Sequence, residues 1–319
     1  MTVSVIIAVK TWQRNLEECV GRCLGIDFPD FEILILSDSP LDKRFTDPRI
    51  RVFPTGPLSP PRKRDMALVY ARGEIIAFLD DDAYPQKDWL KEAADIFSDA
   101  QVAAVGGPAV TPDEDSPRQK ASGAVYSSFL VSGPHTCRYV PLKRKQIDDY
   151  PTCNFFVRKS ILEELGGFKT NFWPGEDTKL CLDIIQRCRK KIIYDPAVLV
   201  YHHRRPLFLP HLRQVASYAL HRGYFVKRFP ATSFKASYFV PSLFLSGLIF
   251  GAALSLFIPL FKAIYFTVLS FYLILAFIAG ITSGMRLAHL VFAGIILTHL
   301  TYGLYFIKGL FSKKMPEEG

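Results

Sequence analysis

Three uncharged apolar stretches towards the end of the chain constrain its fold more than any other feature. They run from about Phe239 to Phe261, from Ile264 to Thr282 and from Leu287 to Ile307, with Lys262 and Arg286 marking the breaks. Each stretch is long enough to cross a bilayer, which takes roughly 20 residues. A helical hairpin buried in a water-soluble protein is a poor alternative, because that much apolar surface needs a much larger partner domain. The sequence therefore predicts a multi-pass membrane protein.

The 319 residues carry a formal net charge of +9, which suits anionic lipids or phosphorylated substrates as partners. Nucleic acid is not an expected partner, because no nucleic-acid-binding motif accompanies the charge. The six cysteines form no CxxC pair and show no zinc-like spacing, which favours buried thiols in a reducing compartment.

The first part of the chain reads as an α/β domain. The run from Val3 to Val9 is almost continuously apolar, as in a strand buried on both faces of a parallel sheet. A helical pattern from Leu16 to Leu24 and a second apolar run from Phe31 to Leu36 complete a βαβ unit. Ligands of such folds collect at the carboxyl ends of the strands. Asp38, after the second strand, is either a ligand of a base or ribose or a plain turn residue.

Three consecutive carboxylates, Asp80, Asp81 and Asp82, follow the apolar run from Ile75 to Leu79. Such a cluster is costly unless a cation balances it, although it can also be a solvated turn that caps the next helix. Oxygen ligands of this kind suit Mg²⁺ or Mn²⁺, whose shells are often completed by substrate phosphates. This pattern indicates a nucleotide-diphosphate substrate.

Two basic clusters point to the same chemistry. Arg62, Lys63 and Arg64 precede a helix, whose dipole they oppose, so they need either solvent or an anion such as a diphosphate. His202 and His203 end a later strand and are followed by two arginines. Together with the aspartate run, they favour a shared metal-diphosphate site.

Two further segments are candidates for acceptor binding and catalysis. From Thr111 to Tyr150 the chain is polar and irregular, which fits a long loop lining an acceptor cleft. Glu176 and Asp177 lie in the first turn of a helix with a core-facing stripe. Acidic residues are favourable there for structural reasons alone, but a carboxylate at the rim of the cleft can also be a general base.

In this order and spacing, the motifs resemble family 2 of the glycosyltransferases, with the GT-A fold, from about Val3 to Arg228. The matching stretches are Val5-Ile6-Ile7, Asp38, Lys63-Arg64-Asp65, Gly73-Glu74, Phe78-Leu79-Asp80-Asp81-Asp82, Gly166-Gly167-Phe168, Gly175-Glu176-Asp177 and Val200-Tyr201-His202. The resemblance implies a Rossmann-like mixed sheet followed by transmembrane helices. It also implies an inverting, metal-dependent transfer of one sugar from a nucleotide-diphosphate sugar to a hydroxyl group.

The resemblance also implies roles for single residues. Mn²⁺ or Mg²⁺ would be bound by Asp82, Asp80 and His202, with His203 as the rival of His202. The nucleotide sugar would be bound by Ala8, Lys10, Asp38, Arg64, Asp80 and Asp81, the last as the spacer of the DxD motif. Asp177 matches the general base, and Glu176 would orient it or the acceptor. After the first strand, the family usually has a proline, an aromatic residue and an asparagine, where this chain has Ala8, Lys10 and Thr11. Ser37 stands where the family usually has an aspartate. These differences concern recognition of the base and of the donor sugar.

The acceptor implied is a lipid-linked or surface glycan of the cell envelope. The Gln-x-x-Arg-Trp motif of processive synthases is absent, which favours addition of a single sugar. A sugar-phosphate nucleotidylyltransferase of related fold should open with a glycine-rich arginine loop, which residues 8–15 lack. An inactive membrane scaffold is a further alternative, but the intact Asp80, Asp82, Asp177 and His202 argue against it.

The predicted domain organisation is a catalytic domain over residues 1–205, a basic interfacial segment over 206–237, a transmembrane region of about three helices over 238–310 and a tail over 311–319. Met1 to Val9 leads directly into a strand, so we expect a cytoplasmic catalytic domain at the plasma or inner membrane. Three crossings would then leave Lys308, Lys313 and Lys314 outside, against the positive-inside tendency. Either one segment is re-entrant or interfacial, or the basic residues before the first crossing dominate.

Overall fold

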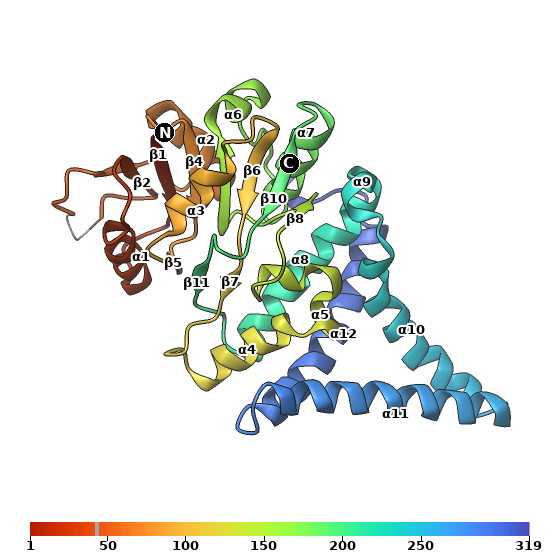
Figure 1. Ribbon diagram of the computed structural model, residues 1–319. Coiled ribbons are helices and arrows are strands. Elements are labelled where there is room, and N and C mark those ends of the chain that lie inside the picture. Colours follow the sequence, from red (N-terminus) through yellow and green to blue (C-terminus); the bar gives the residue numbers. More distant parts are fainter. Residues whose placement is uncertain (42–44, 319) are drawn as a thin grey trace. The chain divides into compact units, whose positions relative to one another are not determined.

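The computed structural model describes residues 1–41 and 45–318, which form two compact units (Figure 1). The sheet unit comprises residues 1–110, 137–203 and 316–318, and the helical unit comprises residues 111–136 and 204–315. Each unit is therefore made of more than one segment of the chain. Residues 111–136, which lie between two strands of the sheet unit in sequence, belong to the helical unit.

The sheet unit is built on an eight-stranded mixed sheet with the order β3-β2-β1-β4-β9-β6-β10-β8. The strand β9 runs antiparallel to both of its neighbours, β4 and β6. The chain order runs outwards from β1 to β3 and then resumes at β4 on the other side of β1, so β1 and β4 flank the topological switch point. The strands are β1 (Val3–Ala8), β2 (Phe31–Ser37), β3 (Ile50–Pro54), β4 (Ile75–Leu79), β6 (Val102–Gly106), β8 (Lys145–Ile147), β9 (Asn154–Arg158) and β10 (Lys191–Tyr194).

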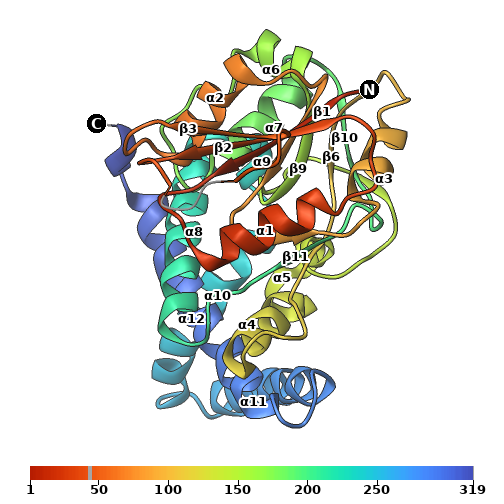
Figure 2. The same ribbon diagram turned by 90° about the vertical axis from the view of Figure 1, so that its left-hand side faces the viewer.

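Helices cover both faces of this sheet (Figure 2), which confirms the predicted α/β class and explains the continuous apolar runs. Every residue of β2 and β4 is buried, as are the first five residues of β1. One core lies between the sheet and α1 (Arg14–Leu24) and α3 (Trp89–Ile96). The other core lies under α2 (Pro60–Tyr70), α6 (Lys159–Leu165) and α7 (Glu176–Gln186).

A three-stranded sheet of order β5-β11-β7 adjoins the main sheet, formed by β5 (Ala83–Pro85), β11 (Val200–His202) and β7 (Ala109–Val110). The buried side chain of Asn154 fixes the segments leading into it. Its Nδ2 donates to the carbonyl groups of Gly107 and Val198, 2.7 Å away in each case, and its Oδ1 accepts from the indole of Trp89 at 2.8 Å. Gly107 has no alternative here, since a Cβ would lie 1.6 Å from the Val198 carbonyl oxygen.

The helical unit contains α4 (Pro117–Ser127), α5 (Phe129–Ser132), α8 (Leu209–Arg228) and α9 (Pro230–Ser233). The prediction of an irregular loop from Thr111 to Tyr150 is therefore wrong. Ser116 and Gln119 form a capping box at the start of α4, and the buried Ala121 and Val125 pack in a cluster with Val291 and Ile295. A short 3₁₀ helix (Gly133–Arg138) follows, and another (Pro316–Glu318) ends the described chain.

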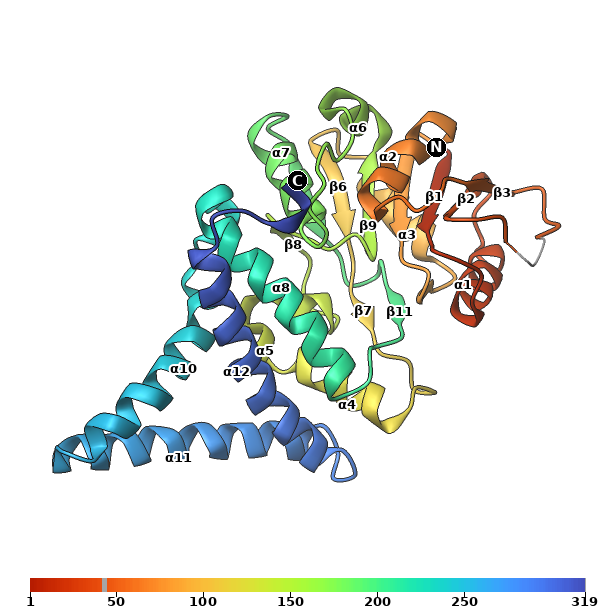
Figure 3. The same cartoon turned by 180° about the vertical axis from the view of Figure 1, so that it is seen from behind.

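Three helices of the helical unit have the length and composition of membrane spans: α10 (Ala236–Ser255), α11 (Pro259–Thr282) and α12 (Ala288–Phe311). Figure 3 shows that α10 and α12 lie together at one end and diverge, while α11 joins their far ends. The break predicted at Arg286 is confirmed, whereas the one predicted at Lys262 is wrong: the first break spans residues 256–258, and Lys262 lies in the first turn of α11. All six cysteines are free thiols, and four of them are buried.

Replacing Asn154 by leucine should destabilise the sheet unit. The change removes partners from the Trp89 indole and the Val198 carbonyl, and each buried polar group left unsatisfied costs about 1–3 kcal/mol. We expect the melting temperature of the detergent-solubilised protein to fall by several degrees. Ser98→Ala removes an exposed hydrogen bond to the Asp95 carbonyl and should leave it unchanged. Equal melting temperatures for Asn154→Leu and the parent would contradict this account.

Candidate active site

Asp80, Asp82 and His202 form a cluster that can hold a metal ion, because each contributes one ligand atom and these atoms all lie within 4.8 Å of one another. Two elements bring them together. Asp80 and Asp82 follow β4, and β5 begins at the next residue, Ala83. The antiparallel register of β5 and β11 sets His202 opposite Ala83, and the imidazole Nε2 lies 3.0 Å from Asp82 Oδ1.

The ring of the neighbouring His203 lies near Glu18 instead, so the geometry favours His202 as the metal ligand, and that role stays a prediction. Its backbone N–H donates to the Asp82 carbonyl at 2.9 Å, so it helps to hold the aspartate loop. Its ring Nε2 lies 3.2 Å from Glu18 on α1, and the ring packs beside Tyr84. His202 is the last residue of β11, and its ring, not that of His203, lies with the two aspartates.

The chemistry of this cluster fits a hard divalent cation. Asp80, Asp81, Asp82 and Glu176 bring four carboxylates into one electrostatically coupled region, where Arg64 is the cation paired with two of them. Burial, together with the negative charges of Asp82 and Asp80, raises the pKa of Asp81 to about 7. An added cation would relieve this repulsion, and two carboxylates with one imidazole are ligands that Mn²⁺ accepts.

Arg64, on α2, is the buried cation of the site. Its Nη1 lies 2.7 Å from Glu176 Oε1 at the start of α7, and its Nη2 lies 3.0 Å from Asp80 Oδ1 at the end of β4. The Glu176 carboxylate also accepts from the Gly175 backbone at 3.0 Å. Burial raises the pKa of Glu176, and the Arg64 charge opposes that rise. The negative charge that balances Arg64 thus comes from two protein carboxylates. A contact of Arg64 with a nucleotide stays a prediction.

Asp177 is the half-buried neighbour of Glu176 in the first turn of α7. The helix begins after Gly175, whose φ of 119° is a conformation that side-chain-bearing residues rarely adopt. Because successive helical residues are rotated by about 100°, the inward direction of Glu176 turns Asp177 away from the core. Asp177 Oδ1 accepts from the Thr178 backbone at 2.7 Å, and its charge acts on Arg64.

At the carboxyl ends of β1 and β2, Lys63 of α2 and Asp38 form a second charged pair. The ammonium group of Lys63 donates to Asp38 Oδ1 and to the Val9 carbonyl, the latter at 2.5 Å. The Asp38 backbone N–H donates to the Lys10 carbonyl at 2.9 Å, so Asp38 and Lys10 lie beside each other, with Ala8 ending β1. The sequence marks Lys63 only as one of three adjacent basic residues, and its contact with Asp38 has no local sequence signal.

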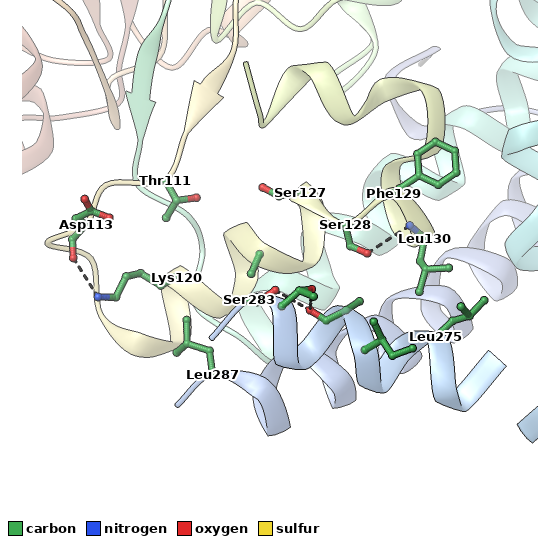
Figure 4. A pocket seen from close by; sticks show the side chains of 14 residues that line it. Thr111, Asp113, Lys120, Ser127, Ser128, Phe129, Leu130, Leu275, Ser283 and Leu287 are labelled. Atoms are coloured by element: carbon green, nitrogen blue, oxygen red, sulfur yellow. Dashed lines mark hydrogen bonds between the residues drawn. The ribbon is translucent and has the colours of Figure 1, made fainter. Parts of the chain in front are cut away.

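A separate hollow of about 620 Å³ lies within the helical unit, between α4 and α5 on one side and the end of α11 and the start of α12 on the other (Figure 4). Thr111, Asp113 and Lys120 form one polar end, where Lys120 Nζ donates to the Asp113 carbonyl at 3.1 Å. The remainder is mainly apolar, with Ala124, Phe129, Leu130, Leu275, Ile278, Ala279 and Leu287 among its lining residues. The hollow is therefore amphipathic along its length.

Comparison with known proteins identifies the fold and the family. The family model described as "Glycosyl transferase family 2" matches residues 4–166, about half of the chain. The chain belongs to glycosyl transferase family 2. This membership supports a glycosyltransferase and does not support the nucleotidylyltransferase alternative.

Individual relatives agree with the family assignment. The chain is 29% identical over 146 residues to the pre-mycofactocin glycosyltransferase of Mycobacterium tuberculosis, covering 46% of this chain and 30% of that protein. It is 25% identical over 188 residues to glycosyltransferase AglE of Haloferax volcanii, covering 55% and 58%, respectively. The matched part therefore spans less than two thirds of either relative.

A solved structure extends the likeness in fold to almost the whole chain. It is the mannosyltransferase PcManGT of Pyrobaculum calidifontis in complex with GDP-Man and Mn²⁺, with a TM-score of 0.63 at 18% sequence identity. The alignment covers 98% of this chain and 88% of the mannosyltransferase. The predicted GT-A fold with C-terminal apolar helices is thus confirmed.

The two histidines provide a matched test of the metal site. His202→Ala should weaken Mn²⁺ binding, measured by isothermal titration calorimetry, by about 10-fold or more, since loss of even an outer partner of a metal ligand typically costs 10–100-fold. His203→Ala should bind Mn²⁺ within about twofold of the parent, because its ring contacts Glu18 instead. The reverse ranking would show that the ion is held elsewhere.

Proposed function

We propose that this family 2 enzyme is an inverting, metal-dependent glycosyltransferase. It moves one sugar from a nucleotide-diphosphate sugar to a hydroxyl group of a lipid-linked or surface-glycan acceptor. The observation that carries the proposal is the Asp80–Asp82–His202 cluster at the carboxyl ends of the strands, in one charged network with the start of α7 through Arg64. The similar fold of a mannosyltransferase solved with GDP-Man and Mn²⁺ supports this type of donor and metal.

The donor site follows the strand ends around the switch point. Asp82, Asp80 and His202 would hold Mn²⁺ or Mg²⁺, which when bound neutralises charge on the diphosphate. Asp38, oriented by Lys63, and the adjoining backbone from Ala8 to Lys10 would receive the base and ribose. Asp81 and Arg64 would fix the aspartate loop against the donor, since Asp81 accepts from Gln13 and Arg64 pairs with Asp80.

Asp177 would be the general base for the acceptor. Its carboxylate takes the proton of the acceptor hydroxyl as the oxygen attacks the anomeric carbon, and the bond from that carbon to the diphosphate oxygen breaks with its electron pair on the diphosphate. A single in-line displacement inverts the anomeric configuration and needs no protein nucleophile. Glu176, buried against Arg64, would hold the first turn of α7 so that Asp177 faces the acceptor.

The amphipathic hollow of the helical unit supports an acceptor with an apolar part. Leu275, Ile278 and Leu287 offer surface to a hydrocarbon chain, while Lys120 and Thr111 mark the end suited to a phosphate or sugar. A free glycan would gain little from this apolar lining, so the lipid-linked class is the one we favour. Lys227, Arg228 and Lys235, which precede the first apolar helix, suit a cytoplasmic catalytic domain at the plasma or inner membrane.

Asp177→Asn should separate chemistry from binding. The amide cannot accept the proton, so the transfer rate should fall by about 10²–10⁴-fold, the usual contribution of a general base. Affinity for a nucleotide sugar in the presence of Mn²⁺, found by screening UDP-, GDP- and dTDP-sugars, should be unchanged. Asp183→Asn is the control, because Asp183 lies on the same helix and pairs with Lys179. Transfer at the parental rate by Asp177→Asn would exclude it as the base.

Filling the hollow should affect only the acceptor. Ala279→Trp places a large side chain in its lining, whereas Val268→Trp changes an exposed residue of the same helix. With polyprenyl-phosphate and polyprenyl-linked saccharides as the acceptor panel, we expect Ala279→Trp to raise the acceptor KM by about tenfold, equivalent to 1.4 kcal/mol of binding. Donor affinity and the Val268→Trp kinetics should match the parent. An unchanged acceptor KM would place the acceptor outside this hollow.

A further inference from the structure

The three apolar helices differ in how much of their surface the protein covers. In the most apolar window of each, 6% of α10 and 11% of α11 is buried, against 39% of α12. Large exposed side chains crowd the junction of α10 and α11, where Leu256 and Phe257 are 80% and 81% exposed. An apolar surface of this size marks a place where a membrane or another protein covers the chain. The helix α12, by contrast, packs against α8, α10, α11 and α4.

The main partner of α12 is α8, which runs beside it in the same direction (Figure 3). The two backbones approach closely at glycines, since a Cβ on Gly223 would lie 2.1 Å from the Phe306 carbonyl oxygen and one on Gly309 2.0 Å from that of Leu220. Further along, His211 on α8 lies 3.0 Å from the Thr298 hydroxyl, near the middle of α12. The depth of α12 in a membrane therefore fixes the depth of α8.

This pairing is incompatible with α12 as a membrane span. The exposed Arg213 lies half a turn from His211, so it would sit near the centre of the bilayer if α12 crossed it. An arginine at that depth costs about 2.5–3.5 kcal/mol on insertion scales. The polar helix α4, with Arg118 and Lys120, also packs on α12 and would be drawn into the hydrocarbon with it.

The end of α12 contacts the start of α10, and the start of α12 contacts the end of α11. At one end, the Phe239 and Phe306 rings lie 5.0 Å apart, and Ser242 Oγ donates to the Gly303 carbonyl at 3.1 Å. At the other end, a Cβ on Gly280 would lie 2.7 Å from the Ala288 carbonyl oxygen. The start of α10 and the end of α12 are thus at the same level, which three successive crossings cannot produce. Residues 316–318, which follow α12, belong to the sheet unit.

From these contacts we infer that α10 and α11 alone enter the bilayer, as a hairpin whose two ends and α12 stay on the side of the catalytic residues. The two helices, about 30 and 36 Å long at 1.5 Å per residue, are long enough for the hydrocarbon core. The partner of the exposed hairpin surface is the lipid hydrocarbon. Lysines and arginines before α10, after α11 and at the end of α12 then share one side, in accord with the positive-inside tendency: Lys227, Arg228, Lys235, Arg286, Lys308, Lys313 and Lys314.

Cysteine accessibility in the full-length protein tests this topology. Single cysteines replace exposed residues at three positions: Ala100→Cys marks the catalytic side, Phe257→Cys the hairpin tip and Lys313→Cys the chain after α12. Sealed vesicles of both orientations are treated with a membrane-impermeant PEG-maleimide, and labelling is read as a gel shift. The parent chain gives the background of its native thiols, of which Cys153 and Cys188 are half-buried.

We expect Ala100→Cys and Lys313→Cys to label in the same vesicle orientation, each at least tenfold faster than in the other orientation. Phe257→Cys should label at least tenfold more slowly than Ala100→Cys from the catalytic side until detergent is added. Labelling of Lys313→Cys and Ala100→Cys from opposite sides would overturn the inference in favour of three crossings. Rapid labelling of Phe257→Cys from the catalytic side would show instead that the hairpin does not enter the bilayer.

Discussion

The position of one buried guanidinium sets the geometry of the candidate active site. Arg64 contacts Asp80 at the end of β4 and Glu176 at the start of α7, so a single side chain joins the aspartate loop to the helix that carries Asp177. A buried arginine is tolerated only with such partners, because desolvation of an unpaired charge costs several kcal/mol. Two carboxylates exceed its single positive charge, and Asp82 adds a third. The contacts of Arg64 therefore fix the positions of these carboxylates but leave an excess of negative charge. A site for a metal ion and a diphosphate needs both properties.

The strands of the sheet and the acidic residues of the candidate site can be predicted from the sequence, because local patterns identify them. Continuous apolar runs identify strands buried on both faces, and carboxylates directly after such runs lie at the carboxyl edge of the sheet. This pattern places Asp38, Asp80 and Asp82 at that edge, directly after β2 and β4. The sequence also predicts that Glu176 and Asp177 lie in the first turn of a helix, and in the structure the Glu176 side chain is buried.

What the sequence could not supply depended on register and on contacts between distant segments. His202 and His203 are adjacent, and only the pairing of β11 with β5 decides which one faces the aspartates. Lys63 differs from its basic neighbours only through its contact with Asp38. The helix α4 is not predicted from its apolar pattern, because its apolar residues form no strong stripe, although the capping box is present in the sequence. Its stability comes from packing on α12.

The hairpin topology bears on what kind of transfer the enzyme performs. Polar structure inside hydrocarbon is tolerated only where protein encloses it, so extrusion of a growing glycan requires several crossing helices around a polar passage. Two crossing helices cannot enclose one. With α12 on the catalytic side, the hollow between α4, α5, α11 and α12 lies at the foot of the hairpin, where lipid head groups meet the protein. That is the level at which a lipid-linked acceptor presents its polar end, so addition of a single sugar from the catalytic side needs no passage through the membrane.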